Sequence, residues 1–311
     1  MTECERLIQE GSLPADFLKP EMRECEVPVE MKKLWALQID MLQQVRKICE
    51  KHNLQFFAVY GTALGAVRHH GFIPWDDDVD IALKRADYNA FVEYAQQELE
   101  EPYFLQLPST DEYYFRPYAS LRNSNATCIA KGDGALKCNN GAIIHIFPLD
   151  GYTESKKLRR FINIERFKNI IAVNSYHYRG RENYLIIRRL LKLITPLVIR
   201  GGLKEHFLRH EAACTKISSE DHEMLGIQYA HFGRDISKFM YRKELFDSVV
   251  WVPFEYAEIP IPVGYEEFLV RSYGDYMQLP KLEDRINKHT WEMDLDTPYK
   301  KYCSEKYNVQ Y

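Results

Sequence analysis

Apolar residues recur at helical spacing in two segments near the start of the chain. Over residues 29–52 they follow the three- and four-residue intervals of one helix face, which predicts an amphipathic helix. A second helix with one apolar face is predicted after residue 83. The positions that define these faces are Met31, Leu34, Trp35, Leu42, Val45 and Cys49 in the first helix, and Tyr88, Phe91, Val92, Ala95 and Leu99 in the second.

Short runs rich in β-branched and aromatic residues predict strands around these helices. The first run leads through Gly61-Thr62 into a short helix, and Pro148 is expected to stop the last run. A further strand is expected at Glu258–Ile261, before a helix that starts near Gly264. The strands predicted in the first half are 55–60, 79–83, 103–107, 113–121, 127–130 and 143–147, with residues 122–125 joining the fourth to the fifth.

Between about residues 154 and 217 the pattern changes to long helical stretches that are strongly basic. From Lys156 to Lys204 there are 13 Lys and Arg residues but two acidic ones, a net charge of +11, so the other 262 residues carry −15. Such asymmetry indicates that one face of the molecule meets an anionic partner. Residues 11–28, with three prolines, are expected to form an extended arm.

The apolar segment 185–199 carries Arg188, Arg189 and Lys192 in a stripe. This pattern is compatible with a helix lying on a membrane surface, although such helices more often pack against their own domain. A third interpretation is that the basic segment grips a polyanionic glycan, such as a teichoic acid precursor.

The overall composition narrows the function classes. With 311 residues, 46% hydrophobic residues and a formal charge of −4, the chain is an ordinary globular protein and not a dedicated nucleic-acid binder. Its seven cysteines include no CxxC pair and are odd in number, which favours reduced thiols in the cytoplasm. No signal-peptide profile and no spanning apolar segment is visible, so a cytoplasmic location is expected.

Four carboxylates within five residues give the strongest chemical signal. Asp76, Asp77, Asp78 and Asp80 repel one another unless a cation neutralises them. Asp78 and Asp80 stand two residues apart on a predicted strand and therefore point to the same face. Such oxygen pairs suit Mg²⁺, which bridges carboxylates to substrate phosphates. Asp76 shares their parity but is expected to lie in the preceding loop, and it is the third candidate ligand.

A phosphate site is predicted just upstream of these aspartates. Gly61 and Thr62 end a strand and open a helix, where backbone N–H groups and the threonine hydroxyl can bind phosphate oxygens. Arg68 is a candidate for further phosphate contacts. A phosphate cradle next to metal-binding carboxylates is the equipment for phosphoryl or nucleotidyl transfer, whereas an acidic surface turn is the plainer alternative.

The segment from Gly61 to Asp80 resembles the signature of the LicD family, choline-phosphate transferases that include the fukutin-related proteins. The matching residues read Gly-Thr-x-Leu-Gly-Ala-x-Arg and then Gly-Phe-Ile-Pro-Trp-Asp-Asp-Asp-x-Asp. Residues 146–151, Ile-Phe-Pro-Leu-Asp-Gly, are similar to the second block of that family. Residues 273–277, Tyr-Gly-Asp-Tyr-Met, with Pro280 are similar to its C-terminal block. The resemblance spans roughly residues 30–290.

The resemblance implies an α+β, nucleotidyltransferase-like fold, with a mixed sheet flanked by helices and an added basic helical region. The expected divisions are an N-terminal arm at 1–28, a catalytic core at 29–153, the basic helical region at 154–220 and a C-terminal mixed region at 221–311 that completes the domain.

The implied reaction moves phosphocholine, or a related ethanolamine or polyol phosphate, from a CDP-linked donor to a hydroxyl of a cell-surface glycan precursor and releases CMP. Mg²⁺, with Mn²⁺ as the alternative, would be held by Asp78 and Asp80. Arg68 and Arg122 would contact the phosphates, although a lone Arg between strands is more often a solvated surface charge. An anionic or lipid-linked acceptor would place the enzyme in the cytoplasm, at the inner face of the membrane if the segment 185–199 makes peripheral contact.

One position departs from the family pattern. The family usually has Ile-Asp-Ile-Phe-Pro where this chain has His145 in place of the aspartate. That carboxylate helps to bind metal and acts as the base, whereas His145 can act as a base near neutral pH but is a poor Mg²⁺ ligand. Two alternatives follow, a nucleotide-binding pseudoenzyme and a nucleotidyltransferase that places NMP on an acceptor. If His145 is not the base, Asp150 or Asp77 is the next candidate.

A tyrosine cluster could supply part of a cage for the cationic choline group. Its members are Tyr113, Tyr114 and Tyr118, on a predicted strand. Aromatic rings attract quaternary ammonium groups through their negative faces. Strand packing is the commoner reason for such a cluster.

Overall fold

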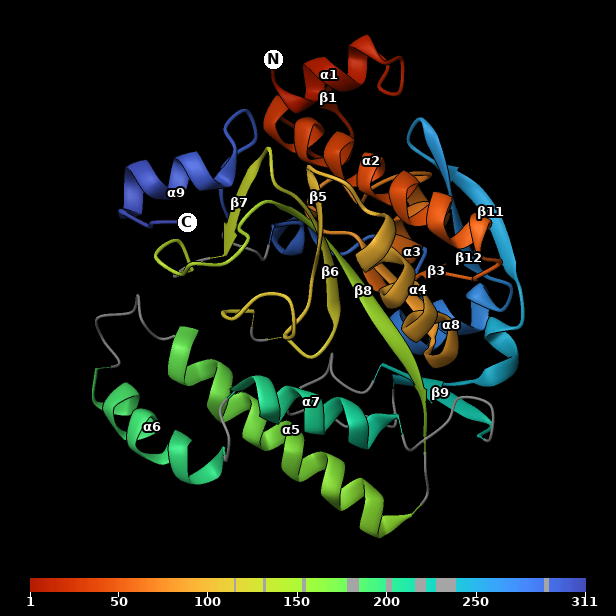
Figure 1. Ribbon diagram of the computed structural model, residues 1–311. Helices are drawn as coiled ribbons and strands as arrows, with labels where there is room; N and C mark the ends of the chain where they lie inside the picture. The colour runs from red at the N-terminus through yellow and green to blue at the C-terminus, as the bar shows by residue number, and fades with distance from the viewer. Residues whose placement is uncertain are drawn as a thin grey trace.

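A computed structural model describes most of the chain and is shown in Figure 1. The described residues are 1–114, 116–130, 133–152, 155–177, 185–199, 203–215, 222–227, 239–287 and 291–311.

The centre of the molecule is a mixed sheet built around one long strand, β8 (Ala142–Gly151). On one side β8 pairs in parallel with β4 (Asp80–Lys84), which pairs antiparallel with β3 (Phe57–Ala58). On the other side the first half of β8 pairs antiparallel with β6 (Ala119–Asn123), and β6 pairs with β5 (Tyr103–Gln106). The end of β8 pairs with β9 (Met224–Gly226), which pairs with β10 (Met240–Arg242). This sheet, flanked by helices, confirms the α+β, nucleotidyltransferase-like class.

Two long helices cover one face of the sheet. These are α2 (Val29–Lys51) and α4 (Arg85–Glu98), which pack against β8 and against each other. Their apolar faces are buried as the periodicity predicts, and Trp35 of α2 stacks on Phe72 with 4.7 Å between ring centroids. The hydroxyl oxygen of Tyr88 in α4 accepts the backbone N–H of Ala119 in β6 at 2.9 Å. The even-numbered residues of β8 face these helices, so the odd-numbered ones, including His145, face the opposite side.

Pro148 does not stop the strand as expected. Strand β8 continues through it to Gly151. Odd-numbered N–H groups of this strand point towards β4, as the bond from His145 N to Val79 O shows, and even-numbered ones point to the other side. There β6 has already ended opposite Ile146 and β9 begins only at Asp150. The missing N–H of Pro148 therefore faces a gap between two partners, where proline is tolerated.

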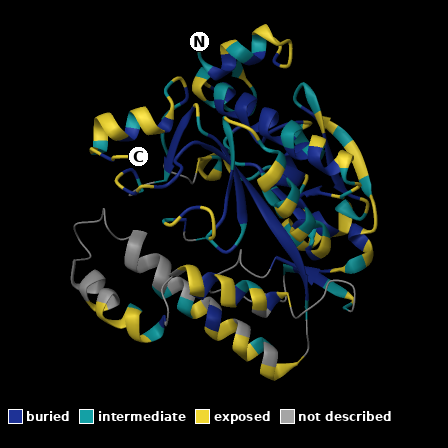
Figure 2. Ribbon diagram, in the orientation of Figure 1, coloured by how far each residue is buried: buried dark blue, intermediate teal, exposed yellow. Residues whose placement is uncertain are grey.

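The basic region forms a helical layer beside the sheet, as predicted. Its helices are α5 (Lys156–His177), α6 (Leu185–Val198) and α7 (Leu203–Cys214), and α5 packs against both others. Figure 2 shows yellow, exposed positions on these helices, in contrast to the dark blue of β6 and β8. Among the described residues, no helix is long and apolar enough to cross a membrane.

The C-terminal part returns to the core. A hairpin of β11 (Val249–Phe254) and β12 (Ala257–Pro262) lies next to β3, and β13 (Trp291–Asp294) pairs with β7 (Thr127–Ala130). The helices here are α8 (Tyr265–Tyr273) and α9 (Tyr299–Tyr307), with 3-10 turns at Lys243–Phe246 and Leu282–Asp284. The strand at 258–261 and the helix after Gly264 are thereby confirmed.

Two further local predictions were wrong. The run 113–121 is strand only from Ala119, and this strand continues through Arg122 and Asn123, which were expected in a turn. Strands β6 and β7 do not pair with each other, because β6 takes β5 and β8 as partners and β7 takes β13.

The N-terminal arm begins with a helix, α1 (Glu3–Gln9), before the two short strands β1 (Glu21–Met22) and β2 (Glu26–Val27). A capping box, in which the side chains of Thr2 and Glu5 bond to each other's backbone N–H, starts this helix. The Thr-x-x-Glu pattern could have predicted it.

Candidate active site

Asp76, Asp77 and Asp78 lie in the turn between α3 (Tyr60–His69) and β4, and Asp80 is the first residue of β4. Asp78 therefore precedes the strand on which it was predicted. Ligand atoms of Asp78, Asp80 and His145 all lie within 4.8 Å of one another, and Asp76, Asp77 and Asp78 form a second such group. The parallel register that places Asp80 beside His145 brings together residues 65 positions apart in the sequence. The structure thus unites the Asp78–Asp80 pair with the residue that departs from the family pattern.

The Gly-Thr turn packs directly under the aspartates. A Cβ atom on Gly61 would lie 2.5 Å from Oδ2 of Asp76, so a larger residue there would displace the Asp76 carboxylate. The Thr62 hydroxyl is buried and accepts the backbone N–H of Asp80 at 2.8 Å. Thr62 therefore positions the start of β4. This structural role differs from the phosphate contact that the sequence predicted for its hydroxyl.

Side chains from distant elements fix the backbone of the turn. Trp35 Nε1 donates to Asp76 O at 3.0 Å, and Gln38 Nε2 donates to Asp77 O at 2.8 Å. The Asp77 carboxylate is buried and accepts from Asn287 Nδ2 at 2.7 Å. Asp77 therefore anchors the turn, whereas Asp76, Asp78 and Asp80 are partly exposed.

His145 lies between the carboxylate of Asp80 and the guanidinium of Arg116. Its Nδ1 is 3.1 Å from Asp80 Oδ1, and its Nε2 is 3.3 Å from Arg116 Nη1. A guanidinium can only donate, so Nε2 is the acceptor and Nδ1 carries the proton that bonds to Asp80. In this tautomer a neutral His145 orients one oxygen of Asp80.

A cavity of about 570 Å³ opens beside the aspartates. Gly61, Arg68, Asp76 and Asp78 line one side of it. Arg68 also donates to Tyr276 O at 2.9 Å, which holds the loop after α8 against the cavity, and burial lowers the pKa of its guanidinium. The remaining wall is formed by residues of the C-terminal block and the loop that follows it, including Tyr273, Asp275, Tyr276 and Asp284.

Arg122 lies away from this cavity. It is 6% exposed, and it donates to Gln106 Oε1 at 2.7 Å and to Gly141 O at 2.8 Å. The interpretation of Arg122 as a solvated surface charge was therefore wrong, and its phosphate contact stays a prediction.

The described cavity lining omits the tyrosine cluster, and the buried Tyr114 shares a hydrogen bond of 2.7 Å with Ser120. Tyr118 does lie at the site, with its ring centroid 5.7 Å from that of His145, so a role for the cluster in binding choline stays a prediction.

Asp150, the alternative base, is at the other end of β8. It is fully buried, and its two oxygens accept from Arg85 Nε at 2.7 Å and Nη2 at 2.9 Å. Five residues along a strand separate it from His145, about 16 Å at 3.3 Å per residue. It is therefore too far from the aspartate turn to act there.

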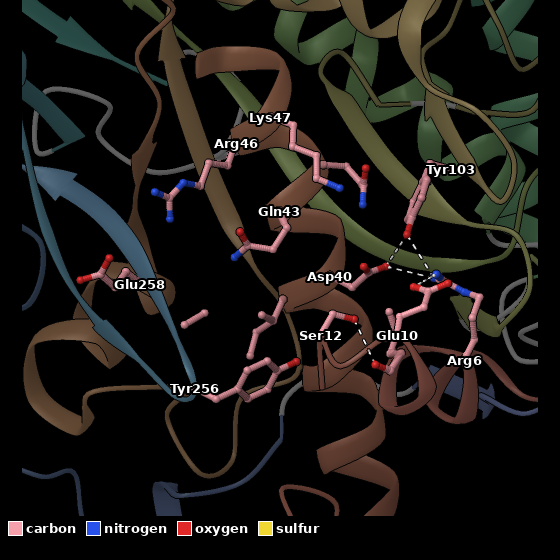
Figure 3. Close-up of a pocket in the computed structure, with 14 residues that line it drawn as sticks. Arg6, Glu10, Ser12, Asp40, Gln43, Arg46, Lys47, Tyr103, Tyr256 and Glu258 are labelled. Carbon is pink, nitrogen blue, oxygen red and sulfur yellow. Dashed lines mark hydrogen bonds and ion pairs between the residues drawn. The ribbon is translucent and has the colours of Figure 1, made fainter. Parts of the chain in front are cut away.

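A larger cavity, of about 770 Å³, lies on the outer side of α2 and is shown in Figure 3. It is bordered by α1, α2 and the start of β12, and at one end the Tyr103 hydroxyl donates to Asp40 Oδ2 at 2.6 Å. None of the aspartates of the turn lines it. Size therefore does not mark the candidate site here, whereas the grouping of ligand atoms does.

The carboxylates of the site fit a divalent cation. Asp78 and Asp80 are partly exposed and converge within one ion's reach, His145 orients one of them, and clustered negative charge favours a cation among them.

The sequence did not point to Arg116, Asn287 or Gln38, because each contacts the site through long-range packing. Tyr273 belongs to the block at residues 273–277 that resembles the family, and this resemblance could have identified it as a residue of the site.

Comparison with known proteins supports the same residues. Residues 53–125 match the family described as LicD/FKTN/FKRP, nucleotidyltransferase domain. The lipopolysaccharide cholinephosphotransferase LicD of Haemophilus influenzae is 29% identical over 262 residues, covering 82% of this chain and 94% of that protein. By these matches the chain is similar to the LicD family.

Shorter matches fall in two other bacterial proteins. An uncharacterized protein of Rickettsia typhi is 37% identical over 59 residues, 19% of each chain. One of Rickettsia prowazekii is 40% identical over 47 residues, 15% of this chain and 18% of that protein. The match to the Haemophilus protein is the informative one, because it covers most of both chains.

Proposed function

We propose that this protein transfers phosphocholine from a CDP-linked donor to a hydroxyl group of a cell-surface glycan precursor and releases CMP. The observation that carries the proposal is the Asp78–Asp80–His145 group, of which Asp78 lines the 570 Å³ cavity. The similarity to a lipopolysaccharide cholinephosphotransferase supports the choice of the transferred group. Ethanolamine and polyol phosphates are the related groups that such a donor could carry.

The reaction is a displacement at phosphorus. The acceptor hydroxyl oxygen bonds to the phosphorus that carries choline, the bond from this phosphorus to the bridging oxygen breaks, and CMP leaves with the bonding electrons. Asp78 and Asp80 would hold Mg²⁺, or Mn²⁺, with Asp76 as a further ligand, and the cation would offset charge on the pyrophosphate.

The protein's own residues prepare this step. Thr62 and His145 fix Asp80 from two sides, through its backbone N–H and through one carboxylate oxygen. Arg68 lines the cavity as a phosphate contact. His145 would take up the acceptor's proton at Nε2, which would first have to give up the hydrogen bond that it accepts from Arg116. Positioned donors and acceptors of this kind act without reorganising during the reaction.

The acceptor is proposed to be anionic or lipid-linked, a lipopolysaccharide or teichoic acid precursor met at the cytoplasmic face of the membrane. In support, α6 exposes Leu190, Leu193, Ile194 and Leu197, which recur at one helix face. Exposed apolar residues on a basic helix are typical of interfacial binding. The side chains of Arg188, Arg189 and Lys192 lie outside the described residues, so the stripe itself remains a sequence prediction.

The test is CMP release from CDP-choline by the purified protein, with a glycan acceptor and Mg²⁺ or Mn²⁺. We expect metal-dependent release that needs the acceptor. Tight binding of CDP-choline without turnover on any acceptor would instead identify a pseudoenzyme, an outcome that His145 makes worth testing. Transfer of CMP itself to the acceptor would identify a nucleotidyltransferase.

A further inference from the structure

Three aromatic side chains converge on the cavity from two segments that are about 200 residues apart in the chain. Trp75 comes from the aspartate turn, Tyr273 is the last residue of α8, and Tyr276 lies in the loop that Arg68 holds. Tyr273 keeps 43% of its surface exposed although it belongs to a helix packed on the core. Its ring therefore lines the cavity and is not enclosed by the core.

The same cavity carries more negative than positive charge away from the metal group. Asp275 and Asp284 line it together with the three rings, and both are exposed. Burial and the nearby carboxylates of Asp76 and Asp80 raise the pKa of Tyr273, which keeps its hydroxyl protonated. Rings and carboxylates together attract a cation, because an aromatic face is negative and the carboxylates add full charge.

Trp75 already has a cation next to it. The guanidinium of Arg285, which is not among the residues lining the cavity, lies 5.8 Å from the Trp75 ring centroid. This separation is within the range of about 6 Å in which a cation and a ring attract each other. The indole is thus placed to interact with positive charge.

We infer that Trp75, Tyr273 and Tyr276, with Asp275 and Asp284, form the subsite for a quaternary ammonium head group beside the metal-binding aspartates. The inference rests on the proposed function and specifies its substrate. Phosphocholine is a zwitterion, and the cavity offers Arg68 for its phosphate and the rings and carboxylates for its cation. A glycerol or ribitol phosphate has no cation and would leave the two carboxylates without a charged partner.

The binding test uses phosphocholine and its uncharged analogue, 3,3-dimethylbutyl phosphate, in which carbon replaces the quaternary nitrogen. Isothermal titration of the whole protein with Mn²⁺ should show tighter binding of phosphocholine. Tyr273→Leu, which removes the ring but not the bulk, should weaken phosphocholine binding about 5- to 30-fold. It should change the affinity for the uncharged analogue by no more than about twofold, so the ratio of the two affinities falls. Tyr273→Phe should retain the preference.

Two controls separate recognition from folding. Tyr311→Leu alters a tyrosine of similar exposure, 39%, that does not line this cavity, and it should change neither affinity. Asp284→Asn should lower the affinity for phosphocholine and spare that for the analogue. If Tyr273→Leu and Asp284→Asn weaken both ligands equally, the inference is wrong and the loop merely shapes the cavity.

A donor comparison separates this inference from the proposed function. CDP-choline should be used at least tenfold more efficiently than CDP-glycerol by the parent, and Tyr273→Leu should reduce that ratio. Equal or better use of CDP-glycerol would overturn the head-group assignment and leave CDP-dependent transfer intact. If no CDP-linked donor is used but phosphocholine binds in a Tyr273-dependent way, the proposed function fails and the subsite stands.

Discussion

The two ends of strand β8 carry polar groups with different roles, one at the candidate active site and one in a buried ion pair. At one end His145 joins Asp80 beside the open cavity, where Asp78 and Asp80 are partly exposed. At the other end Asp150 is fully buried and both of its oxygens are bonded to Arg85. The two residues also point to opposite faces of the sheet, since they differ in parity.

The difference shows how the same residue types become structural or functional. The guanidinium of Arg85 satisfies Asp150 inside the protein, although burial still raises the pKa of that carboxyl. Arg85 also contacts Glu211 of α7 at 3.2 Å, so this pair ties the helical layer to the sheet. At the aspartate turn, carboxylates instead gather close together, and a cation is the partner that would relieve their repulsion.

Removing the buried partner should give the largest effect on stability. Asp150→Asn leaves the buried Arg85 charge with only the more exposed Glu211 as its counter-ion, and we expect a loss of about 3 kcal/mol in the free energy of unfolding. Urea denaturation measures it. Asp247→Asn is the matched control, because Asp247 forms an exposed pair at 3.7 Å with the neighbouring Lys84 and should cost less than about 1 kcal/mol. Similar losses for the two variants would contradict the comparison.

At the aspartate turn, neutralising an acid should remove activity without loss of stability. Asp78→Asn and Asp80→Asn should each abolish Mg²⁺ binding and lower CMP release by about 10²-fold or more, since the charge-stabilising cation is lost. The apo variants should be as stable as the parent or slightly more so, because one repelling charge is gone. Calorimetric Mg²⁺ titration and urea denaturation measure the two effects. Asp16→Asn, at an exposed acid of the arm, is the control. Unchanged Mg²⁺ binding in both variants would exclude this metal site.

A buried histidine of the helical layer, His206 in α7, should make the free energy of unfolding fall at acidic pH. Burial lowers the pKa of His206 to about 4, in spite of the nearby Glu165 carboxylate at 3.5 Å. The unfolded chain, with a histidine pKa of about 6.5, binds the proton first, so stability is complete above pH 6.5 and falls as the pH drops towards 4. The loss should reach about 3 kcal/mol at pH 4.

His206→Asn should remove this component from urea midpoints measured between pH 7 and pH 4. His70→Asn is the matched control, because His70 is exposed and has a left-handed backbone that asparagine adopts readily. It should keep the pH dependence of the parent. If His206→Asn keeps it as well, the proton is taken up elsewhere.

At His145 the expected effect on activity is the smallest. His145→Ala should lower turnover about 10- to 100-fold, as the loss of a group that orients a metal ligand does. His145→Asp should retain or raise Mg²⁺-supported turnover, because an aspartate there provides a hard oxygen ligand and a proton acceptor next to Arg116. Initial rates of CMP release over a pH series measure both variants. Full activity in His145→Ala would place the base at another group, and activity gained only in His145→Asp would mark the parent as a pseudoenzyme.

The sequence by itself determined the local elements and the aspartate turn. Helical periodicity predicted α2 and α4. The Gly-Thr turn and the spacing of Asp78 and Asp80 predicted where the candidate metal ligands gather. These features depend on neighbours within a few residues, which sequence patterns describe well. The same patterns ended β8 at Pro148, because they cannot show that the side of the strand facing its missing N–H has no partner there.

Only the tertiary structure decided which distant groups meet. The parallel register of β4 and β8 places His145 against Asp80, and the fold brings Arg116 to the other side of that ring. It also buries Arg122, pairs Asp150 with Arg85 at the far end of β8, and turns Tyr273 towards the cavity. The physical reason is that strand register and helix docking are fixed by the burial of whole faces, summed over segments up to 200 residues apart, and no local pattern contains that sum.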